Sequence, residues 1–266
     1  MKKTLLKALR VSNSIILADR LRFFYHYFKS SKRRAQFKKR NPSVTLPPAY
    51  HIYETFGLGD YNSYYFGSIE TAQNVLKHFK KHISTDNIKL LDWGCGTGRV
   101  IRHFPTLLDP ASSCLGTDYN STYMNWCKAN IPNVNFSENK LKPPTVYSDN
   151  YFDAIYGISI FTHLSEEMHY KWFEELMRIL KPNGVLQITL SGNAFINKLS
   201  KKEKEQFLKG ELVEHKSYRD GHRSYASHQP KTFVIKMVGK HQVLEHISGK
   251  IKNGSASQDI WLIRKV

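Results

Sequence analysis

Three glycines and two acidic residues are the residues whose types and spacing best indicate chemistry. Gly94, Gly96 and Gly98 stand at alternate positions directly after an apolar run that ends at Asp92. Glycine lets the backbone pass close to a ligand and adopt conformations that other residues avoid. The spacing is G-x-G-x-G, not the G-x-G-x-x-G of a dinucleotide site. Asp92 would repel a pyrophosphate and hold an ammonium group, so this segment predicts a cationic, amino-acid-like ligand.

A second acid, Asp118, ends the next short apolar run along the chain. A carboxylate at that place can accept hydrogen bonds from both hydroxyls of a ribose, and ligands of open α/β sheets bind beyond the carboxyl ends of the strands. Asp92 and Asp118 therefore predict one site for a positively charged nucleoside. The alternative for Asp118 is a role as the N-cap of the helix that follows.

Short apolar runs and amphipathic segments alternate along the body of the chain. Short runs predict strands at 88–92, 113–118, 134–136, 151–159 and 185–190. Two alternating segments, 242–247 and 259–265, predict a terminal antiparallel pair. The amphipathic segments predict helices at 68–81, 99–108, 121–129, 165–181, 200–209 and 230–238. Ser68 and Ser165 are the predicted N-caps of two of them. Alternation of strand and helix indicates an α/β fold with a doubly wound sheet.

Four segments of this region carry motif-like sequences: Leu91–Gly98, Gly116–Tyr119, Phe152–Ser159 and Leu180–Leu186. Together they resemble the first, second and strand-four motifs, and the turn before strand five, of class I S-adenosylmethionine-dependent methyltransferases. The resemblance covers about residues 50–266. It implies a seven-stranded Rossmann-like sheet with a reversed last strand built by residues 240–265.

The same resemblance implies which residues surround the cofactor, S-adenosyl-L-methionine. The implied cofactor-binding residues are Asp92, Gly94, Cys95, Gly96, Asp118, Tyr119, Asn139 and Ile158. Asp92, Gly94 and Gly96 would lie around the methionine moiety and Asp118 on the ribose, with Tyr119 near the adenine. Asn139 matches the position that the family uses for the adenine amino group, with Glu138 as a rival.

His163 follows the predicted strand 151–159 and is the candidate general base. A neutral imidazole there could take the proton from a hydroxyl nucleophile. A structural role beside Ser165 is the alternative. The polar stretch 192–229 predicts an insertion on the substrate side, and its candidates for catalysis are His215, His222, Tyr225 and His228.

The three cysteines, Cys95, Cys114 and Cys127, lack the spacing of metal ligands, so no metal site is predicted. None lies where an enzyme that makes 5-methylcytosine keeps its nucleophile, and packing is their predicted role. Three cysteines without a disulfide framework favour a reducing, cytoplasmic location. The predicted strand four ends in Tyr156-Gly-Ile-Ser, not in an Asn/Asp-Pro-Pro-aromatic sequence, which argues against methylation of adenine or glutamine amino groups.

The net charge of +18 is concentrated at the N-terminus of the 266-residue chain. Residues 1–40 contain 13 Lys and Arg and one acid, Asp19. Their apolar residues recur at helical spacing: Leu5, Leu9, Ile16, Leu17, Leu21, Phe24 and Phe28. Polar interruptions do not fit a signal peptide. The pattern predicts a basic amphipathic extension over 1–45, ahead of a methyltransferase domain over 46–266.

A basic amphipathic helix suits an anionic membrane surface, which predicts a cytoplasmic protein that is peripheral on the inner face of the membrane. The alternatives for residues 1–40 are a solvated arm, a helix packed on the body and an arm that binds nucleic acid. No apolar run has the roughly 18–20 residues that span a bilayer.

Three further segments bear on the acceptor: Ile160–Ser165, Trp126–Cys127 and Gln258–Ile260. They resemble segments of bacterial methyltransferases that accompany surface-polysaccharide and glycolipid synthesis. The resulting hypothesis is O-methylation of a sugar, glycan or lipid-linked saccharide, with tyrosines of the 50–65 region at the acceptor site. The alternatives are methylation of RNA through the basic arm, methylation of a small molecule, and a non-catalytic binding module that keeps the fold.

Overall fold

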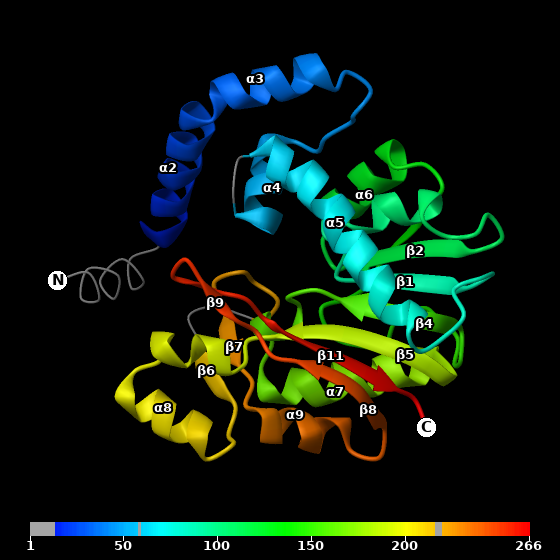
Figure 1. The fold of residues 1–266 in the computed structure, drawn as a ribbon. Coiled ribbons are helices and arrows are strands. Elements are labelled where there is room, and N and C mark those ends of the chain that lie inside the picture. The colour runs from blue at the N-terminus through cyan, green and yellow to red at the C-terminus, as the bar shows by residue number, and fades with distance from the viewer. Residues whose placement is uncertain (1–13, 58–59, 216–219) are drawn as a thin grey trace. The chain divides into compact units, whose positions relative to one another are not determined.

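The computed structural model describes residues 14–57, 60–215 and 220–266, with side chains from Asp19 onward (Figure 1). Two compact units divide the chain at Glu70 and Thr71, within helix α5 (Tyr61–Lys80). They are named here the N-terminal unit and the sheet unit. The predicted boundary between a basic extension (1–45) and a methyltransferase domain (46–266) stays a prediction.

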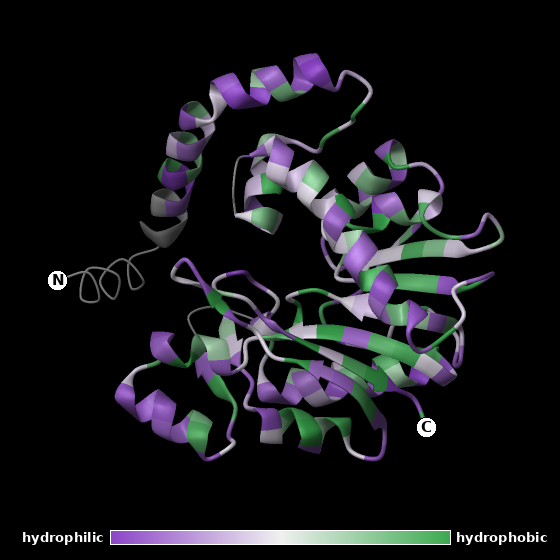
Figure 2. Ribbon diagram, viewed as in Figure 1, coloured by the Kyte–Doolittle hydropathy of each residue, from purple (hydrophilic) through white to green (hydrophobic). Residues whose placement is uncertain are grey.

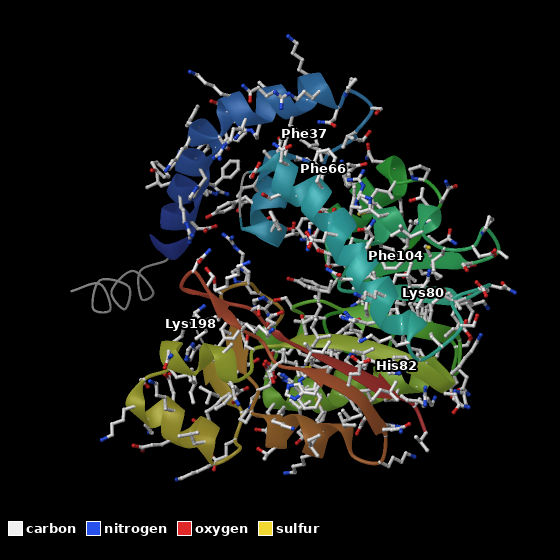
Figure 3. All side chains as sticks on the ribbon, in the orientation of Figure 1. Phe37, Phe66, Lys80, His82, Phe104 and Lys198 are labelled. Atoms are coloured by element: carbon white, nitrogen blue, oxygen red, sulfur yellow. The ribbon has the colours of Figure 1, made fainter. Side chains whose placement is uncertain are left out.

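The N-terminal unit consists of helices, α2 (Ser14–Lys29), α3 (Ser31–Arg40), α4 (Ala49–Phe56) and the beginning of α5. Its core is small and largely aromatic: Phe37, Ile52, Tyr61 and Tyr64 are buried together. Phe37 and Phe66 lie next to each other, with ring centroids 5.9 Å apart (Figure 3). The aromatic residues thus tie α3 to the first turns of α5.

The predicted start of a helix at Ser68 is wrong. Helix α5 begins at Tyr61, and Ser68 is fully buried inside it. The Ser68 hydroxyl donates to the carbonyl of Tyr65, 2.6 Å away, which is the bond of a serine within a helix and not of an N-cap. The aromatic residues before Ser68 extend the helix because they have their own core to pack into.

The sheet unit is built on seven strands in the order β3-β2-β1-β4-β5-β11-β8. Their bounds are β1 (Lys89–Trp93), β2 (Ser113–Asp118), β3 (Asn135–Glu138), β4 (Phe152–Gly157), β5 (Leu180–Leu190), β8 (Gln242–Ile247) and β11 (Asp259–Arg264). Neighbours among β1 to β5 are parallel, and β11 is antiparallel to both β5 and β8. The predicted doubly wound, seven-stranded sheet with a reversed last strand is confirmed.

Alternating residues of the strands face two separate helix layers. Leu91 and Trp93 of β1 face the layer formed by α7 (Glu166–Ile179) and α9 (Lys231–Val238). Leu90, the residue before Leu91, faces the layer that contains η1 (Ile101–Thr106), α6 (Ser121–Asn130) and the end of α5. Both layers are apolar where they meet the sheet, as Figure 2 shows for the hydrophobic strands. A parallel sheet needs this burial on both faces.

The helix predicted over 99–108 is a short 3₁₀ helix, η1, instead. Pro105 lies inside it, and proline lacks the amide that an α-helix would use there. Phe104 of η1 stacks on Tyr156 of β4 at 5.5 Å, so the segment still packs on the sheet. The strands predicted at 113–118 and 242–247 match β2 and β8 in both bounds.

The polar stretch 192–229 is more structured than its composition indicated. It contains η3 (Asn193–Lys198), α8 (Lys201–Leu208) and the short antiparallel pair β6 (Val213–His215) and β7 (Ala226–His228). A second small pair, β9 (Ile251–Lys252) and β10 (Ser255–Ala256), belongs to the segment of the chain that connects β8 to β11. Within the described part of the chain, no helix is both long and apolar enough to cross a bilayer.

A buried glutamine attaches the end of this stretch to Ser191, directly after β5, and to α7. The Gln229 side chain accepts from the Ser191 amide (2.9 Å) and donates to the Ser227 hydroxyl (2.9 Å) and to Nε2 of His169 (3.1 Å). His169 in turn donates from Nδ1 to the Ser165 carbonyl, 2.8 Å away. Burial lowers the pKa of His169 to about 4, so the ring is neutral and both nitrogens have fixed roles.

Replacing the Gln229 side chain is expected to destabilise the sheet unit. Gln229→Ala leaves the buried Ser191 amide and Nε2 of His169 without these hydrogen bonds, which costs about 1–3 kcal/mol in the free energy of unfolding. Urea unfolding followed by tryptophan fluorescence measures it, because all four tryptophans belong to the sheet unit. Gln73→Ala, the same change at an exposed position of α5, is the control. Equal stability of the two variants would contradict the role of Gln229.

Candidate functional site

The polar residues predicted from the sequence gather at the carboxyl ends of the parallel strands. In the strand register Asp92 of β1 lies opposite Tyr156 of β4, and Asp118 of β2 lies opposite Glu138 of β3. Both aspartates are buried, with exposed fractions of 4% and 8%. This edge of the sheet is where ligands of open α/β folds bind, and the structure brings the two predicted acids together there.

The glycine segment turns sharply over the end of β2. The amides of Gly94 and Cys95 both donate to the Thr117 carbonyl, at 2.8 and 3.0 Å. Gly94 has φ +73°, and a Cβ there would lie 2.2 Å from a side-chain carbon of Ile160. Any other residue at position 94 would therefore be strained and would displace Ile160. The segment is a backbone turn held in place by the neighbouring strand.

The carboxylate of Asp118 stabilises this turn. One oxygen accepts from the Gly96 amide and the other from the Asn120 amide, each at 2.9 Å. Burial raises the pKa of Asp118, while these amide donors lower it. The N-cap of α6 is Asn120, whose side chain accepts from Thr122 and Tyr123 amides. The N-cap interpretation of Asp118 is therefore wrong.

Asp92 is a buried carboxyl close to a second acid. Burial raises its pKa to about 7, against the opposing effects of the Tyr156 hydroxyl and the Arg99 charge, and the nearby Asp118 adds to the rise. Two acids buried at adjacent strand ends favour a positively charged ligand, because a cation compensates the cost of their ionisation. The chemistry of this pair fits a sulfonium or ammonium group.

The residues proposed for the adenine end lie beside the acids, already engaged with protein groups. Asn139 accepts from the Thr117 hydroxyl at 2.9 Å and donates to the Lys140 carbonyl at 2.7 Å. Its rival, Glu138, is exposed. The Tyr119 ring is 40% exposed, and its hydroxyl donates to the Gly221 carbonyl at 3.1 Å. Tyr119 thus joins the end of β2 to the insertion.

Ile158 follows β4 and packs against the core layer of α6 and η1, leaving its side chain half-buried. The next residue, Ser159, has φ +64° and takes part in a network that sequence reasoning did not identify. Thr189 accepts from the Ser159 amide (2.8 Å) and donates to Gln258 (2.6 Å), and Gln258 donates to the Ser159 hydroxyl (2.8 Å). Ser159 and Gln258 both belong to segments that resemble methyltransferase motifs, and this resemblance is the sequence signal that could have identified the network.

His163 lies in η2 (Phe161–His163), the turn that follows β4. Its Nδ1 donates to the Tyr225 carbonyl, 2.7 Å away. A carbonyl can only accept, so Nδ1 carries the proton and Nε2 keeps its lone pair. Burial lowers the pKa of His163, and the Tyr225 carbonyl opposes this effect. The ring is therefore neutral and correctly protonated to accept a proton at Nε2.

The predicted N-cap of α7, Ser165, does not cap the helix with its side chain. Asp220 accepts from both the amide and the hydroxyl of Ser165, at 2.5 and 3.1 Å, and Glu214 accepts from the Glu166 amide at 3.0 Å. Two acids of the insertion therefore cap α7 from outside. This long-range capping keeps the insertion next to His163, whose carbonyl also accepts from the Gly221 amide at 2.8 Å.

The other candidates from the insertion have structural partners. Tyr225 is buried and donates to Glu214 at 2.7 Å. His215 lies 3.0 Å from Glu203. His228 is buried, and burial lowers its pKa to about 4. The His222 ring accepts from the Ser224 amide at 3.1 Å. These contacts and the burial of Tyr225 and His228 favour structural roles for the four side chains.

All three cysteines are buried free thiols. Burial raises the pKa of Cys114 and of Cys127 to about 12 and that of Cys95 well above its usual value. The thiolate is the nucleophilic form, so these groups pack and do not react. Among the described residues, no three His, Cys, Asp or Glu side chains gather as metal ligands would.

Comparison with known proteins finds one family that resembles this segment. Residues 90–184 match the family described as "Methyltransferase domain". The match runs from β1 into β5 and contains the glycine turn, Asp92, Asp118 and His163. The family and the fold imply S-adenosylmethionine as the cofactor, which agrees with the cationic ligand that the two acids favour.

Two curated relatives match only part of this chain. An uncharacterized protein of Rickettsia prowazekii is 30% identical over 108 residues, 39% of this chain and 43% of that protein. The tRNA (carboxymethyluridine(34)-5-O)-methyltransferase of Arabidopsis thaliana is 30% identical over 102 residues, 38% of this chain and 23% of that protein. The chain thus spans less than half the length of these curated relatives.

A solved structure is similar over a larger share of the chain. The crystal structure of a SAM-dependent methyltransferase from Methanosarcina mazei aligns with a TM-score of 0.54 and 15% identity. The alignment covers 71% of this chain and 97% of that chain. This likeness confirms the methyltransferase fold.

The raised pKa of Asp92 predicts a pH-dependent stability. Unfolded Asp ionises near pH 4 and folded Asp92 near 7, so between these values the folded chain keeps a proton that the unfolded chain has lost. The free energy of unfolding should therefore fall as pH rises through this window, by up to about 4 kcal/mol.

Urea unfolding at several pH values measures this fall. Asp92→Asn should remove it, because the amide does not titrate. Asp86→Asn, the same change at an exposed acid before β1, should keep it. A slope in Asp92→Asn equal to that of the unmodified chain would show that Asp92 ionises normally.

Proposed function

We propose that this chain is an S-adenosylmethionine-dependent methyltransferase that transfers the methyl group to a hydroxyl of its acceptor. The observation that carries the proposal is the arrangement at the strand ends. Two buried carboxyls and a positive-φ glycine turn meet there, and a neutral histidine with a free Nε2 lone pair follows the fourth strand. The two carboxyls and the glycine turn suit the cationic methyl donor, and the neutral histidine suits a hydroxyl acceptor.

Bound S-adenosylmethionine supplies a methyl group on a positively charged sulfur, already a strong electrophile. The task of the chain is to hold the donor, orient the acceptor oxygen and remove its proton. Asp92, Gly94, Cys95 and Gly96 would hold the methionine moiety. Asp118 would face the ribose, with a lone pair on each oxygen beyond the one used for the turn.

The adenine end has less room for direct hydrogen bonds. Tyr119 would lie along the adenine, and Ile158 would supply apolar contact from the end of β4. The Asn139 amide oxygen already accepts from Thr117, so it would offer its second lone pair to the adenine amino group. These assignments are the ones that the resemblance to class I methyltransferases implies.

The proton of the acceptor hydroxyl would move to Nε2 of His163. The Tyr225 carbonyl fixes the proton on Nδ1, and burial keeps the ring neutral at physiological pH. General-base assistance of this kind accelerates a reaction by about 10²–10⁴-fold. A carboxylate acceptor would need no base, so an intact His163 favours a hydroxyl.

For the acceptor itself, we propose a sugar, glycan or lipid-linked saccharide. Support comes from motif residues next to His163 and Gln258 that resemble those of methyltransferases of surface-polysaccharide synthesis. The tyrosines of the N-terminal unit are weaker support, because Tyr53, Tyr61 and Tyr64 are buried in its core and cannot face an acceptor.

RNA is the second candidate acceptor, and one observation favours it. The Arabidopsis relative is named as a tRNA O-methyltransferase. Transfer of labelled methyl from S-adenosylmethionine to a cell extract separated into glycolipid, polysaccharide, RNA and protein distinguishes the candidates. Label in the saccharide fractions supports the first proposal, and label in RNA replaces it with the second.

Cofactor binding should depend on Asp118. In Asp118→Asn a single oxygen accepts and the negative charge is lost, so the turn at Gly96 loosens and the ribose contact weakens. The affinity for S-adenosylmethionine, measured by calorimetry, should fall about 10- to 100-fold. Asp109→Asn is a matched control, because Asp109 also accepts from a backbone amide (Ala111, 2.8 Å) but precedes β2. Unchanged affinity in Asp118→Asn would refute the assignment.

Turnover should depend on His163. His163→Gln can still donate to the Tyr225 carbonyl but cannot accept the proton as a base. We expect turnover to fall about 100-fold or more, with unchanged affinity for S-adenosylmethionine. His241→Gln is the control, because His241 precedes β8 at the opposite edge of the sheet. Full turnover of His163→Gln would exclude His163 as the base.

A further inference from the structure

Helix α2 has one face that is packed within the N-terminal unit. The Phe23 ring lies 5.1 Å from Tyr50 and 5.5 Å from Tyr53 of α4. The Tyr53 hydroxyl donates to the Asp19 carboxylate, 3.0 Å away, and His26 contacts the same tyrosine ring. Asp19, Phe23 and His26 follow helical spacing, so they define the inward face of α2.

The junction between α2 and α3 is fixed by a buried arginine. Arg34 donates to the Ser30 hydroxyl at 2.6 Å and to the Tyr27 carbonyl at 2.5 Å, and its guanidinium lies 3.6 Å from the centre of the Tyr27 ring. Phe37, one turn further along α3, is buried against Tyr61. The two helices therefore present their outward sides in a fixed relation.

The opposite face of α2 is apolar and uncovered. Leu21, Phe24, Tyr25 and Phe28 are 62%, 51%, 60% and 68% exposed. At 100° per residue, the spacing i, i+3, i+4 and i+7 places them in one stripe about 100° wide. Large apolar side chains gathered on a surface in this way mark an interaction site.

Positive charge surrounds this stripe. Arg20 lies along one side of it, and Arg22 and Lys29 along the other, all exposed. Helix α3 is mostly hydrophilic (Figure 2). Its exposed basic residues are Lys32, Arg33, Lys38, Lys39 and Arg40. Asp19, the one acid of residues 1–40, is turned inward to Tyr53, so no acid lies among these bases.

We propose that this docking face, consisting of the α2 stripe (Leu21, Phe24, Tyr25 and Phe28) and the surrounding exposed bases, binds the surface of an anionic phospholipid bilayer. An interfacial helix buries an apolar stripe at the level of the headgroups and places bases beside it against anionic lipid. Charge complementarity and the apolar stripe select this partner together. The proposal concerns the N-terminal unit and does not depend on the reaction of the sheet unit.

Single-stranded RNA is the competing partner, because bases and aromatic rings also bind nucleic acid. Two features favour lipid. Leu21 belongs to the stripe, yet it has no ring on which a nucleobase could stack. The Lys and Arg side chains flank the stripe on both sides, whereas an RNA-binding surface interleaves Lys or Arg with aromatic rings along one groove.

The test is flotation of the full-length chain with two kinds of vesicle, phosphatidylcholine alone and equal parts of phosphatidylcholine and phosphatidylglycerol. We expect binding to the anionic vesicles, and loss of at least about tenfold in the double variant Phe24→Ser, Phe28→Ser. Both residues are exposed, so folding should be retained. The affinity for S-adenosylmethionine should be unchanged.

The matched control is the double variant Leu208→Ser, Ile251→Ser. It removes two apolar side chains of similar exposure, 74% and 57%, from the sheet unit. It should float as the unmodified chain does. Equal loss in both double variants would overturn the proposal, because the effect would then be unspecific. Retention of an RNA oligonucleotide that is lost only in Phe24→Ser, Phe28→Ser, with flotation unchanged, would assign the face to RNA instead.

A second measurement uses the buried state of the native thiols. An environment-sensitive fluorophore on Phe28→Cys should shift to shorter wavelength when anionic vesicles are added, because the apolar stripe enters the bilayer. The same label on Leu208→Cys should not shift. Absence of a shift at position 28, with the chain bound to vesicles, would show that the docking face is not the membrane contact.

Discussion

The bond of the Asp118 carboxylate to two backbone amides is the constraint on which the cofactor side depends. It connects the end of β2 to the Gly96 amide and to the start of α6 through Asn120. The glycine turn has few side chains of its own, so its shape is imposed from the neighbouring strand. A carboxylate buried for this purpose is also a negative group held at the sheet edge. Structural support and ligand charge therefore come from one residue.

The acceptor side is organised by a different means. Acids of the insertion cap α7, and the buried Gln229 and His169 join the insertion to the strand ends. His163 lies between these attachments, and the Tyr225 carbonyl sets its tautomer. A stretch with little apolar content thus becomes ordered by hydrogen bonds to a rigid sheet.

Local pattern predicted the elements best where one principle governed them. Strand β2 was predicted in both bounds because a short buried segment ends at a polar residue on each side, Ser113 and Asp118. The prediction failed at Ser68, because Tyr61 and Tyr64 pack against Phe37, which is distant in sequence, and so extend the helix toward its N-terminus. It also failed at Ser165, because the groups that cap α7 come from residues 214 and 220. Contacts between residues distant in sequence leave no local signal.

The amino-acid sequence alone determined the order of strands and helices, the glycine turn, the two acids and the basic amphipathic extension, because each is encoded in residues close together in the chain. Tertiary structure decided the protonation of the groups, since burial raises the pKa of Asp92 and lowers that of His163. It also decided which face of α2 is uncovered, because Tyr50 and Tyr53 cover the other one. Burial and long-range partners exist only after the chain has folded.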